Sequence, residues 1–253
     1  MTTIRQAYLN AQMNTIGEPS DIPGTHPSPA VFPVGFDSAG EQVCWNTNHD
    51  PHLFILGSVV DGLDTVLHHL SNQARNHENR WDLYSANAFG AGKHAHGLTE
   101  TAWHKGANLN LYVTMIEELS KIYHDRKKAL RNYRMDSFAA LRRATRINSL
   151  LVIMPDLTDI IADPRPEVQS IVDIAYLIAT HGYEVGIHGV FVFDRMGTNQ
   201  LYSDVLSDAS SVILRNMSDS TVFGDMVTQI PHEKGYGLFK TNDNIHRSFF
   251  HTL

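Results

Sequence analysis

Two glycines, Gly57 and Gly62, follow a short apolar run, and a helical pattern begins directly after them. This G-x-x-x-x-G spacing is typical of a loop that cradles phosphate groups between a strand and a helix. Such a loop continues with Lys, which neutralises phosphate charge, and with Ser or Thr, which holds Mg²⁺. Here these two positions are Leu63 and Asp64. The pattern therefore poses two alternatives, a nucleotide site that has lost its chemistry or a strand-turn-helix that only resembles one.

Two features near this loop bear on its charge. A carboxylate at a helix N-terminus is favourable by about 0.3–1 kcal/mol, so Asp61 or Asp64 could fill the place of a phosphate. Lys93 follows two glycines after a predicted strand, and it could reach an anion bound beside the loop. The alternative for Lys93 is a surface loop without a ligand. The candidate cofactor-binding residues are Gly57, Ser58, Gly62, Leu63, Asp64 and Lys93.

These candidates belong to a chain in which apolar segments alternate with amphipathic ones. The alternation predicts an α/β fold with a mainly parallel central sheet flanked by helices. Residues 1–30 are rich in Pro and Gly and predict an extended arm before one domain over 31–253. We expect a hairpin over 30–46, strands at 52–57, 81–90, 149–155, 187–195, 209–217, 236–240 and 247–253, and helices at 63–77, 109–132, 137–145 and 166–182, the last closed by Gly182.

The composition is that of a globular protein. The chain has 253 residues, of which 42% are hydrophobic and 19% are charged, enough for one large α/β domain. No apolar run is long enough to span a membrane, and the N-terminus has no signal-peptide core. The single cysteine, Cys44, cannot form an internal disulfide. We expect a cytoplasmic protein with no membrane partner.

Charge is distributed unevenly along the chain. Residues 121–146 contain nine Lys or Arg and two Asp, a local charge of +7, whereas the whole chain carries −7. Such a block could contact nucleic acid or an acidic neighbouring subunit, or it could be a solvated helix face. A pI near 6.1 argues against coating DNA by bulk charge. The candidate nucleic-acid contacts are Lys121, Arg126, Lys127, Lys128, Arg131 and Arg134.

Fifteen histidines raise the question of a metal site. No H-E-x-x-H motif and no paired Cys/His spacing accompanies them. We therefore predict no metal site and rank a metal-dependent hydrolase last.

Five blocks of sequence occur in a fixed order. They are PVGFDSAGEQV (33–43), PHLFILGSVVDGLD (51–64), LLVIMPDLTDII (150–161), GIHGVFVFDR (186–195) and VILRNMSDSTVFGD (212–225). Together they resemble the motor domain of the FtsK/SpoIIIE group of P-loop ATPases, to which the EccC-type ATPases of type VII secretion are related. The resemblance runs from about Val34 to the C-terminus, and it implies a RecA-like P-loop NTPase fold.

The chain departs from these motifs at the positions whose side chains would bind phosphate, metal and water. By resemblance, Pro155 replaces the metal-binding Asp at the end of a strand, Asp156 replaces the following Glu, and Asp194 replaces a sensor Gln. Arg195 and Arg215 match arginines of the later blocks. The resemblance marks Asp156, Arg195 and Arg215 as vestigial catalytic positions, while the apolar framework is retained.

The resemblance therefore implies a pseudo-ATPase, an accessory or structural subunit related to DNA translocases. It would form a homo-oligomeric ring, for example a hexamer, or join an active ATPase in a hetero-complex. No cofactor is expected. One alternative is an active DNA translocase that uses ATP and Mg²⁺ with Lys93, Asp156 and Asp159. Another is a nucleic-acid-binding module built on residues 121–146, which predicts salt-sensitive binding to DNA.

Overall fold

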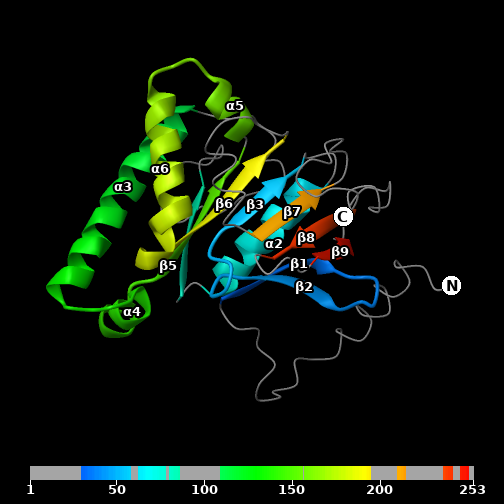
Figure 1. The fold of residues 1–253 in the computed structure, drawn as a ribbon, viewed down its shortest axis with the longest axis horizontal. Helices are drawn as coiled ribbons and strands as arrows, with labels where there is room; N and C mark the ends of the chain where they lie inside the picture. Colours follow the sequence, from blue (N-terminus) through cyan, green and yellow to red (C-terminus); the bar gives the residue numbers. More distant parts are fainter. Residues whose placement is uncertain are drawn as a thin grey trace.

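The computed structural model describes residues 30–57, 62–77, 80–85, 109–155, 157–194, 210–214, 236–241 and 246–250. The predicted arm lies almost wholly outside these residues. The described strands form one nine-stranded sheet in the order β2-β1-β9-β8-β7-β3-β6-β5-β4 (Figure 1). Their bounds are β1 Val31–Phe36, β2 Gln42–Asn46, β3 Leu53–Leu56, β4 Trp81–Ser85, β5 Ser149–Met154, β6 Ile187–Phe193, β7 Ser210–Leu214, β8 Tyr236–Lys240 and β9 His246–Phe250.

The sheet has a parallel half and an antiparallel half. Strands β7, β3, β6, β5 and β4 pair in parallel, as the alternation of strands and helices predicted. The late strands β8 and β9 pair antiparallel, and so does the β1–β2 hairpin. The links over 37–41 and 241–245 are too short for the crossover that a parallel pair needs. The late strands therefore extend the parallel sheet with an antiparallel edge, which the sequence pattern did not indicate.

Helices cover both faces of the sheet (Figure 1). Along β3, Leu53 and Ile55 pack with α2, whereas Phe54 and Leu56 pack with the helices of the opposite face. This alternation buries β3 on both sides and accounts for its continuous apolar run. None of the helices described is long and apolar enough to cross a membrane. The helices are α2 Leu63–Asn76, α3 Leu109–Asn132, α4 Phe138–Thr145, α5 Leu157–Ala162, α6 Glu167–His181 and the 3₁₀ helix η3 Gly182–Val185.

Helix α6 ends at His181 and has Gly182 as its C-cap, as the sequence predicted. Gly182 has a right-handed φ of −58°, and the chain continues from it directly into the 3₁₀ helix η3. Gly186 ends the turn with φ +69°, a conformation that favours glycine. A Cβ atom at Gly186 would also lie 2.0 Å from a ring atom of Phe138. Gly186 therefore has two reasons to be glycine, its backbone conformation and the ring packed against it.

Arg126 joins α3 to the start of two strands. Its guanidinium donates hydrogen bonds to the carbonyls of Val185 at 2.8 Å and Asn148 at 2.7 Å. It also lies over the ring of Phe138, 4.9 Å from the ring centre. Arg126 is 8% exposed. The assignment of Arg126 to a nucleic-acid surface is therefore wrong, because its charged group faces the interior and its donors are used by backbone carbonyls.

Two histidines lie near the amino-terminal edge of the sheet, His52 buried and His188 partly buried. His188 Nδ1 donates to the carbonyl of Pro51 at 2.9 Å, and His52 Nδ1 accepts from the amide of Gly189 at 3.0 Å. Burial, with a smaller contribution from His188, lowers the pKa of His52 to about 3. Burial is also the main cause that lowers the pKa of His188 to about 4. Both side chains are therefore neutral structural groups at pH 7.

We predict that Arg126→Met lowers the free energy of unfolding by about 2–4 kcal/mol, because it leaves buried carbonyls without a donor. Denaturant unfolding measures this change. Lys128→Met is the matched control, since Lys128 is exposed on the same helix and should shift stability by less than about 0.5 kcal/mol. Equal effects of the two substitutions would contradict the structural role of Arg126.

We also predict that stability falls as the pH is lowered from about 6.5 toward about 4. In this window the unfolded chain takes up protons on His52 and His188 that the folded chain does not bind, which costs up to about 1.4 kcal/mol per pH unit for each histidine. Above pH 6.5 this contribution to stability is fully present. Urea unfolding across the window measures the slope, and NMR titration of the ring protons reports each pKa. Ring pKa values near 6.5 in the folded protein would refute the prediction.

Candidate functional site

The phosphate-loop pattern lies where an open α/β sheet usually binds ligands. Gly57 follows β3, which lies between β6 and β7, while the next strand in the chain, β4, is at the far edge of the sheet. The strand order therefore reverses at β3. In such sheets ligands bind outside the carboxyl ends of the strands at this reversal.

Backbone hydrogen bonds fix this edge of the sheet. The amide of Gly57 donates to the carbonyl of Phe193 at 2.9 Å, which joins the ends of β3 and β6. The amide of Asp194 donates to Thr158 Oγ1 at 3.2 Å, which joins the end of β6 to α5. Gly62 adopts φ +96° and is the N-cap of α2. A strand that leads to Gly57 and a helix that begins after Gly62 are therefore present, while residues 58–61 lie outside the described part of the chain.

Leu63 takes up a core position instead of a ligand position. It is the first residue of α2, and it is 5% exposed. Its side chain belongs to the apolar cluster that α2 forms with β1, β2 and the sheet. The face of α2 formed by Leu63, Val66, Leu67, Leu70 and Ala74 is buried. Asp64 is the second residue of α2.

The first residue after β5 is a proline, which has no side-chain oxygen that could bind a metal ion. Pro155 is buried, and its carbonyl accepts a hydrogen bond from the hydroxyl of Tyr112 on α3. Asp194, at the end of β6, is exposed. None of Gly57, Pro155 and Asp194 carries a positive charge. Nothing in the sequence singled out Tyr112 or Thr158, because each acts through a backbone group of a distant segment.

The structure leaves several predicted site residues untested. They lie outside the described part of the chain and remain predictions. They are Ser58, Lys93, Asp156, Arg195 and Arg215.

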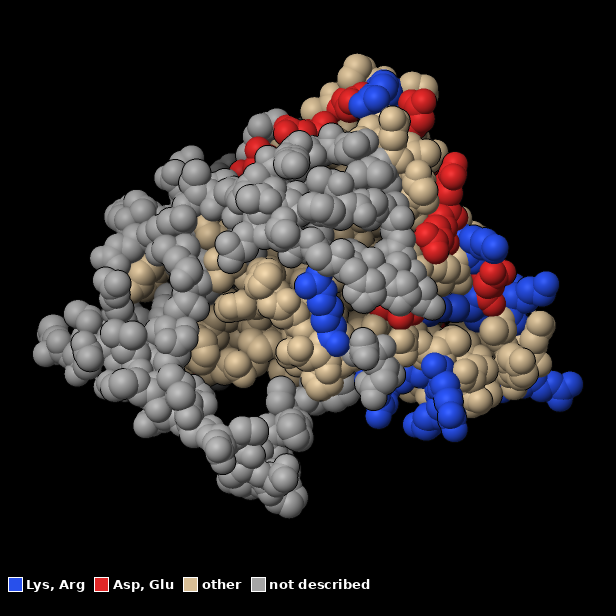
Figure 2. All heavy atoms as spheres, turned by 180° about the vertical axis from the view of Figure 1, so that it is seen from behind, with Lys and Arg blue, Asp and Glu red and all other residues tan. Residues whose placement is uncertain are grey.

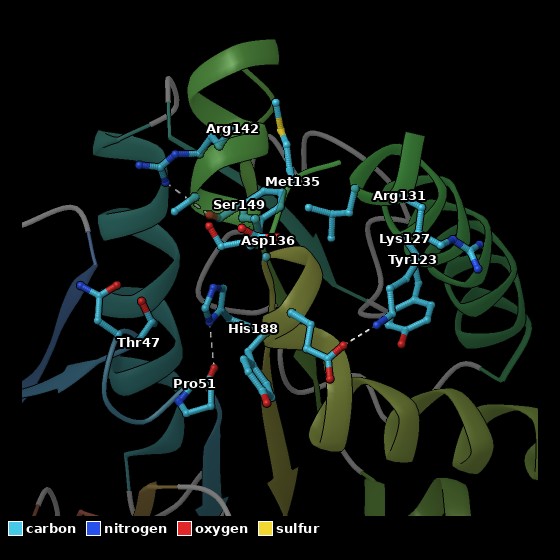
Figure 3. A pocket seen from close by; sticks show the side chains of 18 of the residues that line it. Thr47, Pro51, Tyr123, Lys127, Arg131, Met135, Asp136, Arg142, Ser149 and His188 are labelled. Carbon is cyan, nitrogen blue, oxygen red and sulfur yellow. Dashed lines mark hydrogen bonds and ion pairs between the residues drawn. The ribbon is translucent and has the colours of Figure 1, made fainter. Parts of the chain in front are cut away.

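A second feature lies at the opposite, amino-terminal edge of the parallel strands. It is a cavity of about 1260 Å³ between the segment before β3, the C-terminal half of α3, α4 and the start of β6 (Figure 3). His188 and Ser149 lie at the starts of β6 and β5, and Arg142 of α4 reaches Ser149 Oγ at 3.5 Å. The sequence pattern contained this basic segment but did not indicate that it lines a cavity.

The basic block divides into buried, paired and exposed members. Arg126 is buried, and Lys127 forms an ion pair with Glu184 of η3. Lys and Arg side chains gather at the end of the molecule formed by α3 and α4 (Figure 2). The exposed candidates are Lys121, Lys128, Arg131 and Arg134.

Comparison with known proteins gives likeness in structure only. No protein-family profile matches the chain, and no curated protein sequence does. The pCW3 conjugation coupling protein TcpA, in a structure with ATPγS, has a TM-score of 0.71 at 16% identity over 92% of this chain and 68% of TcpA. The cytoplasmic domain of the type VII secretion ATPase EccC from Thermomonospora curvata has a TM-score of 0.68 at 17% identity. ATPases 2 and 3 of EssC from Geobacillus thermodenitrificans have a TM-score of 0.61 at 17% identity.

The likeness covers 90% of this chain in both secretion proteins, but the chain spans only 29% of the EccC structure and 42% of the EssC structure. The match therefore concerns one domain of these larger proteins. The strand order and these likenesses agree with one another. The chain has the P-loop NTPase fold that these ATPase structures share.

Proposed function

We propose that this chain is a catalytically degenerate FtsK/SpoIIIE-like protein, a pseudo-ATPase that acts as a structural or accessory subunit of an oligomer. The observation that carries the proposal is the burial of Leu63 in the apolar core at the place of the phosphate-binding Lys. A nucleotide carries several negative charges, and a buried Leu at that place offers none of the compensation that Lys supplies.

The end of β5 supports the same conclusion. Pro155 has no side-chain oxygen for Mg²⁺, and its carbonyl is already bonded to Tyr112. Mg²⁺ in such sites is held by carboxylate and hydroxyl oxygens together with the phosphates. The chain has Leu63 in place of the phosphate-binding Lys and Pro155 in place of the metal-binding Asp. Because both positions lie at the carboxyl edge of the sheet, these replacements weaken nucleotide binding and hydrolysis together. The proposed subunit would then contribute its surface to a ring or to a complex with an active ATPase.

A second candidate function is nucleic-acid binding by the basic block. The exposure of Lys121, Lys128, Arg131 and Arg134 favours it. The burial of Arg126 and the ion pair of Lys127 remove two of the six proposed contacts. The active translocase remains the third candidate, and it depends on Lys93, whose place the structure does not describe.

We predict that the protein binds ATP with Mg²⁺ more weakly than about 1 mM and shows no ATPase activity with or without duplex DNA. Calorimetry and a phosphate-release assay measure the two quantities, and DNA alone is titrated in parallel. Micromolar ATP binding or DNA-stimulated turnover would overturn the pseudo-ATPase proposal. Lys93→Ala would then show whether the translocase alternative holds, since it should abolish that signal. DNA binding without nucleotide, weakened by salt, would instead support the second candidate.

We predict that Leu63→Lys lowers the free energy of unfolding by about 2–3 kcal/mol, because it removes a buried apolar side chain and places an amine at the core. Thermal or denaturant unfolding measures the loss. Asn76→Lys is the control, because Asn76 is exposed at the other end of α2 and should change stability by less than about 0.5 kcal/mol. A Leu63→Lys variant that is as stable as the wild type and gains ATP binding would show that residue 63 faces the phosphate loop and not the core.

A further inference from the structure

The cavity at the amino-terminal edge gathers positive charge in a protein that is acidic as a whole. Its lining contains four Lys or Arg side chains and two acidic ones, a net charge of +2, whereas the whole chain carries −7. Lys127 and Glu184 neutralise each other in an ion pair. The other three cations are all arginines and outnumber the other acidic residue, Asp136, so the cavity is suited to an anionic ligand.

Arg142 has free donors for such a ligand. Its Nη1 donates to Ser149 Oγ at 3.5 Å, a long hydrogen bond to a neutral group. Burial, and after it the neighbouring cations Arg80 and Arg143, lower the pKa of Arg142. Among the described residues no carboxylate forms an ion pair with it. A guanidinium has five N–H donors in a rigid fork, so most of them are left for the oxygens of a phosphate group.

Two hydrogen-bond acceptors lie near this arginine. His188 pairs with Leu151 in the sheet, so its side chain leaves the same face as that of Ser149. Its Nδ1 donates to the carbonyl of Pro51 at 2.9 Å, and the neutral ring therefore keeps an unprotonated Nε2. Figure 3 shows the carboxylate of Asp136 on the same side of the cavity. An anion alone would leave these acceptors unpaired, whereas hydroxyl groups of the same ligand would donate to them.

The opposite side of the cavity is aromatic as well as basic. Figure 3 shows Tyr123 and Arg131 across the cavity from Arg142. Tyr183 also lines the cavity and is 52% exposed. Pockets for small organic molecules combine aromatic walls with a few placed polar groups and have volumes of about 300–1,000 Å³. The cavity, at about 1260 Å³, is far larger than a phosphate ion, so it has room for an anion that carries an organic body.

We propose that this cavity binds a small phosphorylated sugar. Arg142 and Ser149 donate hydrogen bonds to the phosphate. His188 and Asp136 accept hydrogen bonds from the sugar hydroxyls, and the tyrosines of the opposite side pack against the body of the ligand. The site lies at the edge of the sheet opposite to the phosphate-loop pattern, so it does not depend on the pseudo-ATPase proposal.

Ribose 5-phosphate is the probe, and it is titrated by calorimetry beside ribose and inorganic phosphate. We expect ribose 5-phosphate to bind with a Kd below about 1 mM, and each of the other two to bind at least about tenfold more weakly. Arg142→Met should weaken the binding of ribose 5-phosphate by at least about tenfold, because it removes charged donors from the phosphate. Arg143→Met is the matched control, since Arg143 is exposed on the same helix and does not line the cavity. It should leave the affinity within about twofold, because water and salt screen its charge.

Asp136→Ala separates recognition of the sugar from attraction of any anion. The substitution makes the cavity more positive, so attraction of charge alone would strengthen the binding of ribose 5-phosphate. Loss of an acceptor for a hydroxyl should instead weaken it by about threefold or more. Stronger binding to the Asp136→Ala variant would overturn the assignment of a sugar.

Inorganic phosphate that binds as tightly as ribose 5-phosphate would overturn the proposal, and so would equal affinities of the wild type and Arg142→Met. The same holds for ribose 5-phosphate that does not bind at about 10 mM. A single-stranded oligodeoxythymidine that binds more tightly than ribose 5-phosphate and loses that binding in Arg142→Met would assign the cavity to a nucleic-acid strand instead. Circular dichroism checks that every variant is folded. ATP bound at the carboxyl edge would keep its affinity in Arg142→Met, so failure of this proposal and failure of the pseudo-ATPase proposal are distinguishable.

Discussion

The guanidinium of Arg126 is the point at which the α3–α4 unit is attached to the sheet. It reaches the carbonyls of Asn148, before β5, and of Val185, before β6, while Phe138 of α4 packs against its flat face. Gly186 completes this junction, because only a residue without a Cβ leaves room for the Phe138 ring. A charged group removed from water requires satisfied hydrogen bonds, so α3, α4 and two strand starts are held in one arrangement. The wall of the amino-edge cavity follows from that arrangement.

The central strands are buried on both faces of the sheet. The amino ends and the carboxyl ends of these strands therefore form two separate surfaces. Because α2 covers one face and α3, α5 and α6 cover the other, the strand ends remain the places where backbone turns reach the surface. At the carboxyl edge Gly62 caps α2, and residue 63 is a buried Leu and not a cation. At the amino edge the starts of β5 and β6 lie beside a cluster of arginines. The fold thus places the exposed arginines at the end of α3 at the edge of the sheet opposite to Gly57 and Gly62.

The residues at the carboxyl edge are held in place by contacts within the protein that need no ligand. Gly57 still bonds to Phe193, and Thr158 still bonds to the amide of Asp194, because these contacts hold strands and helix together whether or not a phosphate binds. Leu63 adds apolar contact area to α2, which stabilises the helix without a ligand. This is the physical basis on which we propose an accessory and not a catalytic subunit.

The sequence by itself determined the parallel core and the buried face of α2, since both depend on local periodicity. It also determined which positions of the phosphate loop lack their usual residue types, because that needs only order and spacing. It did not determine that Arg126 is structural while Lys121 and Lys128 are exposed. The basic residues of α3 are alike in sequence, and only the packing of α3 against the rest of the protein decides which of them is buried. The antiparallel edge, the 3₁₀ turn that Gly186 ends and the cavity beside His188 were likewise decided by tertiary structure. Each depends on contacts between segments far apart in the chain, such as Arg126 with Val185, and sequence spacing carries no information about such contacts.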